Sequence, residues 1–408
     1  MIMKSLTRGF VSFLIVLSPL APFGAIAQNT STLTLEAFLE AAKRESPDLA
    51  LEKANLEAAS ARASGIRISP PMVGLMQMKE NSTSRNGYEI SQELPFPTKI
   101  AQDKKVRDLE FETQKENNKY QSALILNEAR NAYLAFWSTY EKLQIIKDKH
   151  HWLKHHVSLT RSATRSDSLA QVHLLEVESD SDLIENEILS TEAELSEKRN
   201  SLKIYAPSLD VESILPKEPA LPTLEIEKSS RSLVILKEKE VASLEAQESL
   251  KKQSYIPDLF LRLRSFEGNE MASANQEIMV GITLPFLYFW QPKAEISEAS
   301  AQRMRTQAEL QKTKIEFESR LSTLTKKVES LKVQLKNLKE KLIPRAERRR
   351  KLVTNLSTRT MEGLDEHKSV VVGFLDLRMK AIDLRLEYEN TFKEILKLTG
   401  ANSNAGAL

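Results

Sequence analysis

Two very long stretches of the chain contain almost no helix-breaking residues. The segment 99–210 has no glycine and one proline, and the segment 293–400 has one proline and three glycines. Runs such as LSTLTKKVESLKVQLKNLKEKL (321–342) place Leu or Val at three- and four-residue steps, with Lys and Glu between them. This pattern predicts helices that pack side by side. A helix of about fifty residues is roughly 75 Å long at 1.5 Å per residue, so it must bury its apolar stripe against a return helix and neighbours.

Turn-favouring residues gather near the middle of each long segment, at 159–171 and 356–369. Ser, Thr, Asp and Gly are frequent there, and Ser and Asp favour caps and turns over helix interiors. Each long segment is therefore predicted to fold back as an antiparallel helical hairpin, with its tip at this cluster.

Four short segments ahead of the long ones are predicted to be strands, in two pairs: 66–79 with 87–96, and 255–266 with 276–286. Alternation is clearest in the second pair, where apolar Leu259, Leu261 and Leu263 face one way. Phe260, Arg262 and Arg264 face the other way. Polar loops between the paired strands predict solvated hairpin ends.

The tripeptide Leu-Pro-Phe ends a predicted strand twice, at Leu94–Phe96 and at Leu284–Phe286. Proline cannot donate to a sheet ladder, so each copy marks a strand that leaves the sheet before a long helix begins. The similar order of features on both sides of each copy predicts an internal two-fold repeat. We divide the chain into a leader (1–27), a first repeat (28–210), a linker (211–222), a second repeat (223–403) and a tail (404–408).

The first 27 residues are expected to be a secretory signal peptide. Lys4 and Arg8 precede an apolar core, and Ala25-Ile26-Ala27 fits the small-x-small cleavage pattern. The alternative, a retained membrane anchor, is less favoured because Pro19 and Pro22 interrupt a short apolar run. We therefore expect an exported protein.

Composition excludes several functional classes. The chain has no cysteine, hence neither disulfides nor thiolate ligands. Its formal net charge is +2, which gives no electrostatic reason to expect a nucleic-acid partner. The sequence contains no G-x-S-x-G, P-loop or H-E-x-x-H motif, and its carboxylates are spread over helical faces. We therefore predict no enzymatic activity and no cofactor.

Five segments together resemble the TolC-type family of outer-membrane efflux proteins. They are LTLEAFLEAAKRESPDLALEKANLEAASAR (33–62), ISQELPFPTKI (90–100), VGITLPF (280–286), LIPRAERRRKL (342–352) and EILKLTG (394–400). Each pattern is loose by itself, whereas their order, spacing and duplication are specific. The PRAE and LTG segments are most similar to the heavy-metal cation efflux branch. The tips depart from the family, because the usual Tyr-x-x-Gly is absent.

The resemblance implies a mainly α fold with a small β part and a homotrimeric assembly. Each chain is expected to contribute four strands to a shared twelve-strand β-barrel in the outer membrane, and long helical hairpins to a periplasmic α-barrel. Four strands of about ten residues cannot close a barrel alone, and open edges are not tolerated in lipid. The implied partners are a periplasmic adaptor protein, an inner-membrane pump and outer-membrane lipid.

Candidate site residues lie at the predicted tips. Acidic residues that could form gate rings at a threefold mouth are Asp365, Glu366, Glu362 and Asp167. Candidate adaptor contacts are Arg161, Arg165 and Ser168 at the first tip and Arg359, Thr360, Gly363 and Leu364 at the second. The alternative for both sets is an ordinary solvated turn.

Two further groups have open interpretations. His151 and His155 stand four residues apart in HHWLKHH (150–156), a spacing that can chelate zinc or copper, although solvated histidines explain the run equally well. Tyr88, Tyr288 and Trp290 suit either an interfacial aromatic belt or packing against a helix start.

The predicted function is a passive duct that exports metal cations, small toxic compounds or peptides. One alternative is a periplasmic coiled-coil adaptor or scaffold without a barrel. Another keeps the barrel but serves type I protein secretion. The residues alone do not separate these possibilities.

Overall fold

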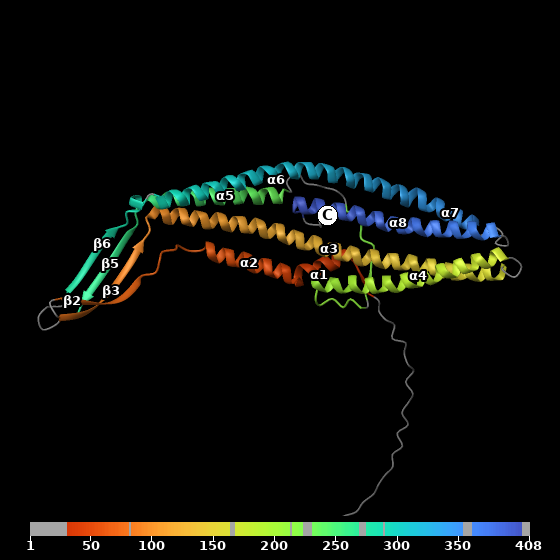
Figure 1. Ribbon diagram of the computed structural model, residues 1–408, viewed down its shortest axis with the longest axis horizontal. Helices are drawn as coiled ribbons and strands as arrows, with labels where there is room; N and C mark the ends of the chain where they lie inside the picture. Colours follow the sequence, from red (N-terminus) through yellow and green to blue (C-terminus); the bar gives the residue numbers. More distant parts are fainter. Residues whose placement is uncertain are drawn as a thin grey trace, which may run out of the picture.

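The protein is strongly elongated, with a small sheet at one end and the paired helix ends of two hairpins at the other (Figure 1). The computed structural model describes residues 31–80, 83–163, 168–212, 214–222, 231–268, 275–288, 290–353 and 361–401. The predicted leader, 1–27, lies outside the described residues.

The N-terminal part is a short strand followed by two helices: β1 (Ser31–Leu33), α1 (Leu35–Glu45) and α2 (Pro47–Ala63). The Thr34 side chain caps α1 by accepting a hydrogen bond from the Ala37 amide at 3.2 Å. Pro47 occupies the first position of α2, where its missing N–H costs nothing.

The sheet is antiparallel and contains four strands in the order β2-β3-β5-β6. Their bounds are β2 (Met72–Glu80), β3 (Thr83–Leu94), β5 (Leu259–Phe266) and β6 (Asn275–Ile282). The central contact pairs the two halves of the chain, with Leu94 opposite Leu259 and Gly87 opposite Phe266. All four predicted strands are therefore present, and they form one sheet.

Helix α3 (Pro97–Ala163) has 67 residues and is about 100 Å long at 1.5 Å per residue. It is the spine of the molecule, because α1, α2, α4, α5 and α8 all pack on it. Helix α4 (Ser168–Ser201) returns along α3 and ends in the short 3-10 helix η2 (Leu202–Ile204). This is the first predicted hairpin.

The short strand β4 (Ile214–Pro216) lies between the two halves, and the second half then contains helix α5 (Ser232–Lys252) and the 3-10 turn η3 (Gln253–Tyr255). After β6 come η4 (Pro285–Tyr288) and α6 (Trp290–Asn337). A π-helical turn, η5 (Leu338–Leu342), joins α6 to α7 (Ile343–Val353). Pro344 lacks an N–H donor, which accounts for the irregular turn before it. Helix α8 (Met361–Thr399) completes the second hairpin.

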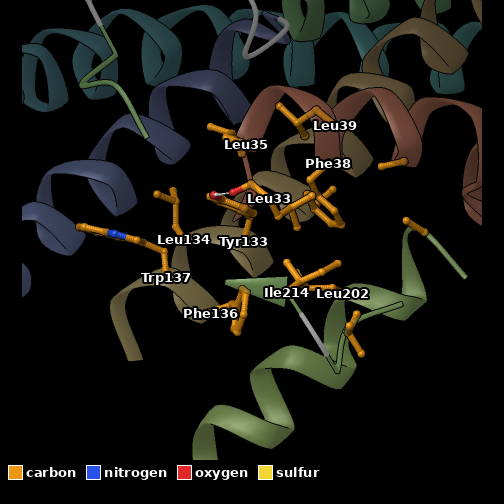
Figure 2. Close-up of a cluster of buried hydrophobic side chains, with 14 of the residues drawn as sticks. Leu33, Leu35, Phe38, Leu39, Tyr133, Leu134, Phe136, Trp137, Leu202 and Ile214 are labelled. Carbon is orange, nitrogen blue, oxygen red and sulfur yellow. Dashed lines mark hydrogen bonds between the residues drawn. The ribbon is translucent and has the colours of Figure 1, made fainter. Parts of the chain in front are cut away.

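The largest core cluster lies where α1, α3, η2 and β4 meet (Figure 2). Tyr133 is fully buried there, and its hydroxyl lies 2.7 Å from the Leu33 carbonyl oxygen and 2.8 Å from that of Lys217. Burial is the main reason that the pKa of Tyr133 rises to about 12. The tyrosine thus holds β1 and the segment after β4 against the spine.

Two details differ from the sequence predictions. The predicted linker 211–222 contains β4, which pairs in parallel with β1. Residues 361–369, expected in the second turn, already belong to α8. The pairing of β1 with β4 depends on partners far apart in the chain, which local patterns do not report.

Candidate functional site

One face of the sheet is apolar and exposed. Paired residues in neighbouring strands share a face, so the register places Leu75 with Tyr88, Ile90 with Leu263, and Leu261 with Val280 on this side. Leu75 is 94% exposed and Val280 is 71% exposed. We define the apolar face by the exposed members Val73, Leu75, Tyr88, Ile90, Leu94, Leu259, Leu261, Ile278, Val280 and Ile282. An apolar surface of this extent marks an interaction with a partner or with lipid.

The opposite face is charged. Glu89 of β3 forms salt bridges with two arginines of β5. Its carboxylate oxygens lie 3.1 Å from Arg262 Nε and 2.8 Å from Arg264 Nε. The predicted alternation of Leu and Arg along β5 is therefore confirmed. Charges of β3 and β5 on one side and aliphatic side chains on the other make the sheet amphipathic.

Both exits from the sheet meet at one residue, Asp258. Its Oδ1 accepts a hydrogen bond from the Phe96 amide at 3.1 Å, and its Oδ2 lies 2.7 Å from Lys99 Nζ. The backbone N–H of Asp258 donates to Thr283 Oγ1 at 2.8 Å. Strand β3 ends at Leu94 and α3 begins at Pro97, as the first Leu-Pro-Phe predicts. Asp258 was not a predicted site residue, because its partners are distant in sequence.

The aromatic candidates lie on exposed surfaces of the sheet and of the second exit. Tyr88 is on the apolar face, and Tyr288 and Trp290 are more than half exposed. The Tyr288 and Trp290 rings contact each other edge to face, with centroids 5.5 Å apart. The belt interpretation and the packing interpretation of these residues both stay predictions.

The acidic candidates at the second tip are divided between salt bridges and solvent. Glu366 pairs with Arg349 at 2.6 Å, and Asp365 Oδ1 lies 3.4 Å from His173 Nδ1. Glu362 is exposed in the first turn of α8. Asp167 lies outside the described residues.

The adaptor candidates differ in their exposure to solvent. Arg161 is exposed and its Nη2 is 2.6 Å from Glu178 Oε1, which links α3 to α4. Gly363 is half-buried, and Ser168 is the first residue of α4. Leu364 is 0% exposed, so its side chain is buried within the chain, and we correct the prediction that it contacts a partner. Arg165, Arg359 and Thr360 lie outside the described residues.

The histidine run behaves differently from expectation. His151 and His155 are exposed on α3, and their role as a metal pair stays a prediction. Within the described residues, no three His, Cys, Asp or Glu side chains are placed to hold a metal ion. His156 is instead completely buried, beside His173 of α4 and His367 of α8. The sequence analysis missed this cluster, because its members come from three helices.

Across the described helices, none combines the length and the apolar character that crossing a membrane requires.

The chain is similar in fold to several solved outer-membrane proteins. The chain is similar to the CmeC outer membrane channel of Campylobacter jejuni, with 12% identity, a TM-score of 0.72, and coverage of 90% of this chain and 85% of that one. It is also similar to the open state of the MtrE outer membrane channel of Neisseria gonorrhoeae, with 12% identity, a TM-score of 0.74, and coverage of 90% and 89%. It is similar as well to the outer membrane protein VceC of Vibrio cholerae, with 14% identity, a TM-score of 0.69, and coverage of 90% of this chain and 96% of that one.

No protein-family model and no curated protein sequence matches the chain. Each of the three structural likenesses covers 90% of the chain. The chain therefore has the fold of the outer-membrane channels.

Proposed function

We propose that this protein is the outer-membrane duct of a tripartite export system. The observation that carries the proposal is the amphipathic four-stranded sheet at one end of a helical body about 100 Å long. Its apolar face suits lipid, and its Glu89–Arg262–Arg264 face suits a water-filled interior. The fold shared with outer-membrane channels supports the same assignment.

The proposed assembly is a homotrimer. In one chain β2 and β6 are the outer strands of the sheet, so each has one edge without a strand partner among the described residues. Open edges are not tolerated in lipid, and three copies of four strands close a twelve-strand barrel. The order α2-β2-β3-α3-α4, followed by α5-β5-β6-α6-α7-α8, supports the proposed internal repeat.

The proposed partners are a periplasmic adaptor and an inner-membrane pump. The proposed duct is passive, so a pump must supply the energy for export. The adaptor is expected to bind at the tips, around Arg161, Arg165, Ser168, Arg359, Thr360 and Gly363. Asp365, Glu366, Glu362 and Asp167 are the proposed gate carboxylates. Metal cations or small toxic compounds are the proposed cargo, which rests on the sequence resemblance to the heavy-metal branch.

Fractionation and conductance test the proposal. The full-length protein should enter the outer-membrane fraction as a trimer whose gel mobility changes on heating, and it should conduct ions in a planar bilayer. A protein that is wholly soluble after export would overturn the duct and favour the coiled-coil scaffold. Exposing a deletion strain to metals, to drugs and to secretion reporters then separates efflux from type I protein secretion.

A further inference from the structure

Three buried histidines meet where the first helical hairpin packs against α8. His156 comes from α3, His173 from α4 and His367 from α8, and all three are at least nine-tenths buried. The ring centroid of His156 lies 5.8 Å from that of His173 and 6.0 Å from that of His367. Each histidine stands within about two turns of a hairpin end.

The rings have few hydrogen-bond partners. Within the described residues neither nitrogen of His156 has a partner, and the same holds for His173 Nε2 and His367 Nδ1. Trp152 lies over His156, with ring centroids 4.9 Å apart, and its ring centroid is 5.4 Å from that of His367. A neutral imidazole tolerates burial without hydrogen-bond partners far better than an imidazolium ion does.

The carboxylates near the cluster do not neutralise the positive charge that a proton would place on His156. On α8, Lys368 Nζ lies 2.7 Å from Glu176 and 2.8 Å from Asp180, so the lysine already engages both carboxylates. Asp365 and Glu176 lie 3.4 and 3.6 Å from His173 Nδ1 and therefore face that ring. The titratable neighbours that act on His156 are therefore histidines and Lys368.

We propose that His156, packed against His173 and His367, is the acid-sensitive element of a latch, which holds the α3–α4 hairpin against α8 at neutral pH and releases it on acidification. The latch concerns a contact within one chain and stands independently of the export function proposed above.

The direction of the pH effect follows from the pKa values of the buried histidines in the packed state. Burial, reinforced by the neighbouring His173, His367, Lys368 and His155, lowers the pKa of His156 from 6.5 to about 4. Burial also lowers the pKa of His367. The packed contact therefore binds fewer protons than the opened one, and acid favours opening. Above pH 6.5 there is no effect, and between pH 6.5 and about 4 one proton raises the opening constant by up to about tenfold per pH unit.

Spin-label distances test the latch in the full-length protein. The chain has no cysteine, so Gln171→Cys on α4 and Ser369→Cys on α8, both exposed, provide two unique labelling sites. Labelled chains diluted with unlabelled protein report the distance within one chain. Between pH 7.5 and 5.0 we expect the ratio of long-distance to short-distance populations to rise about thirtyfold, since pH 5.0 lies about 1.5 units below 6.5.

The variants separate the latch from general acid unfolding. His156→Leu should reduce the pH response to a few-fold or less, whereas His151→Gln, at an exposed histidine of the same helix, should keep the full response. If His156→Leu fails to pack at pH 7.5, His367→Leu replaces it, and we expect a reduced response. A wild-type distance that does not change with pH overturns the latch. An equal response in the wild type and the packed leucine variant overturns it as well.

Discussion

At the scale of single residues, close approach decides where the sheet tolerates a side chain. A Cβ added to Gly87 of β3 would lie 2.5 Å from the Ser265 carbonyl oxygen, whereas one added to Gly74 of β2 would meet nothing within 4 Å. The Ser265 oxygen belongs to the backbone of the adjacent strand and cannot turn away.

We predict that Gly87→Ala weakens the pairing of β3 with β5 by about 1–3 kcal/mol, as overpacking usually does. Hydrogen exchange of the amides in these strands, followed by mass spectrometry, should accelerate about tenfold or more. Gly74→Ala is the matched control and should change exchange little. Equal acceleration in both variants would contradict the close-approach argument.

A buried charge network joins α3 to α8. Glu389 is 2.8 Å from Arg130 and 2.7 Å from Arg385, and all three side chains are at least nine-tenths buried. Arg385 also donates to the carbonyl oxygens of Pro219 and Ala220. The network therefore fixes the segment after β4 to α8.

We predict that Glu389→Gln lowers the free energy of unfolding by about 3–5 kcal/mol, because two buried guanidinium groups lose their carboxylate. Denaturant titration followed by helical circular dichroism measures the change. Glu394→Gln removes an exposed partner of Lys397 on the same helix, and should cost well under about 1 kcal/mol. A similar loss in both variants would refute the assigned role of burial.

At the scale of elements, the junction between sheet and spine depends on Asp258. We predict that Asp258→Ala frays the start of α3, because the Phe96 amide and Lys99 both lose their acceptor. Hydrogen exchange of residues 96–100 should accelerate about tenfold. The β5–β6 pairing should persist, because the backbone N–H and carbonyl oxygen of Asp258 still bond to Thr283.

Asp108→Ala serves as the control for this junction. Asp108 also pairs with a lysine of α3, Lys104, but both side chains are more than 40% exposed. Exposed pairs of this kind contribute little to stability. If Asp108→Ala frays α3 as much as Asp258→Ala does, the junction does not depend on Asp258.

At the scale of the whole molecule, the two faces of the sheet are expected to meet different solvents. We predict that Leu75→Arg, on the apolar face, reduces the amount of protein in the outer-membrane fraction, with a cost of about 2–4 kcal/mol if the residue lies near the middle of the bilayer. Met76→Arg places the same charge on the opposite face and should be tolerated much better.

Quantitative immunoblotting of fractionated membranes compares the two arginine variants. The helical circular dichroism of each purified variant shows whether it has folded. Equal membrane levels for two folded variants would argue against a lipid-facing surface.

Local patterns in the sequence determined most of the element content. Long segments without glycine became α3 and α4, Leu-Pro-Phe marked the end of β3, and alternation placed Leu261 and Arg262 on opposite faces. These features follow from local backbone chemistry and from the periodicity of neighbouring residues, so they can be read without knowing the fold.

Only the tertiary structure decided which distant residues meet. It paired β1 with β4, brought Asp258 to the start of α3, buried Leu364 and gathered His156, His173 and His367. Such contacts join helices and strands many residues apart, and a periodic pattern does not specify which neighbour a helix face packs against. The sequence therefore determined which segments form helices and strands. The packing of distant segments around α3 decided which charged side chains and imidazoles are buried away from solvent.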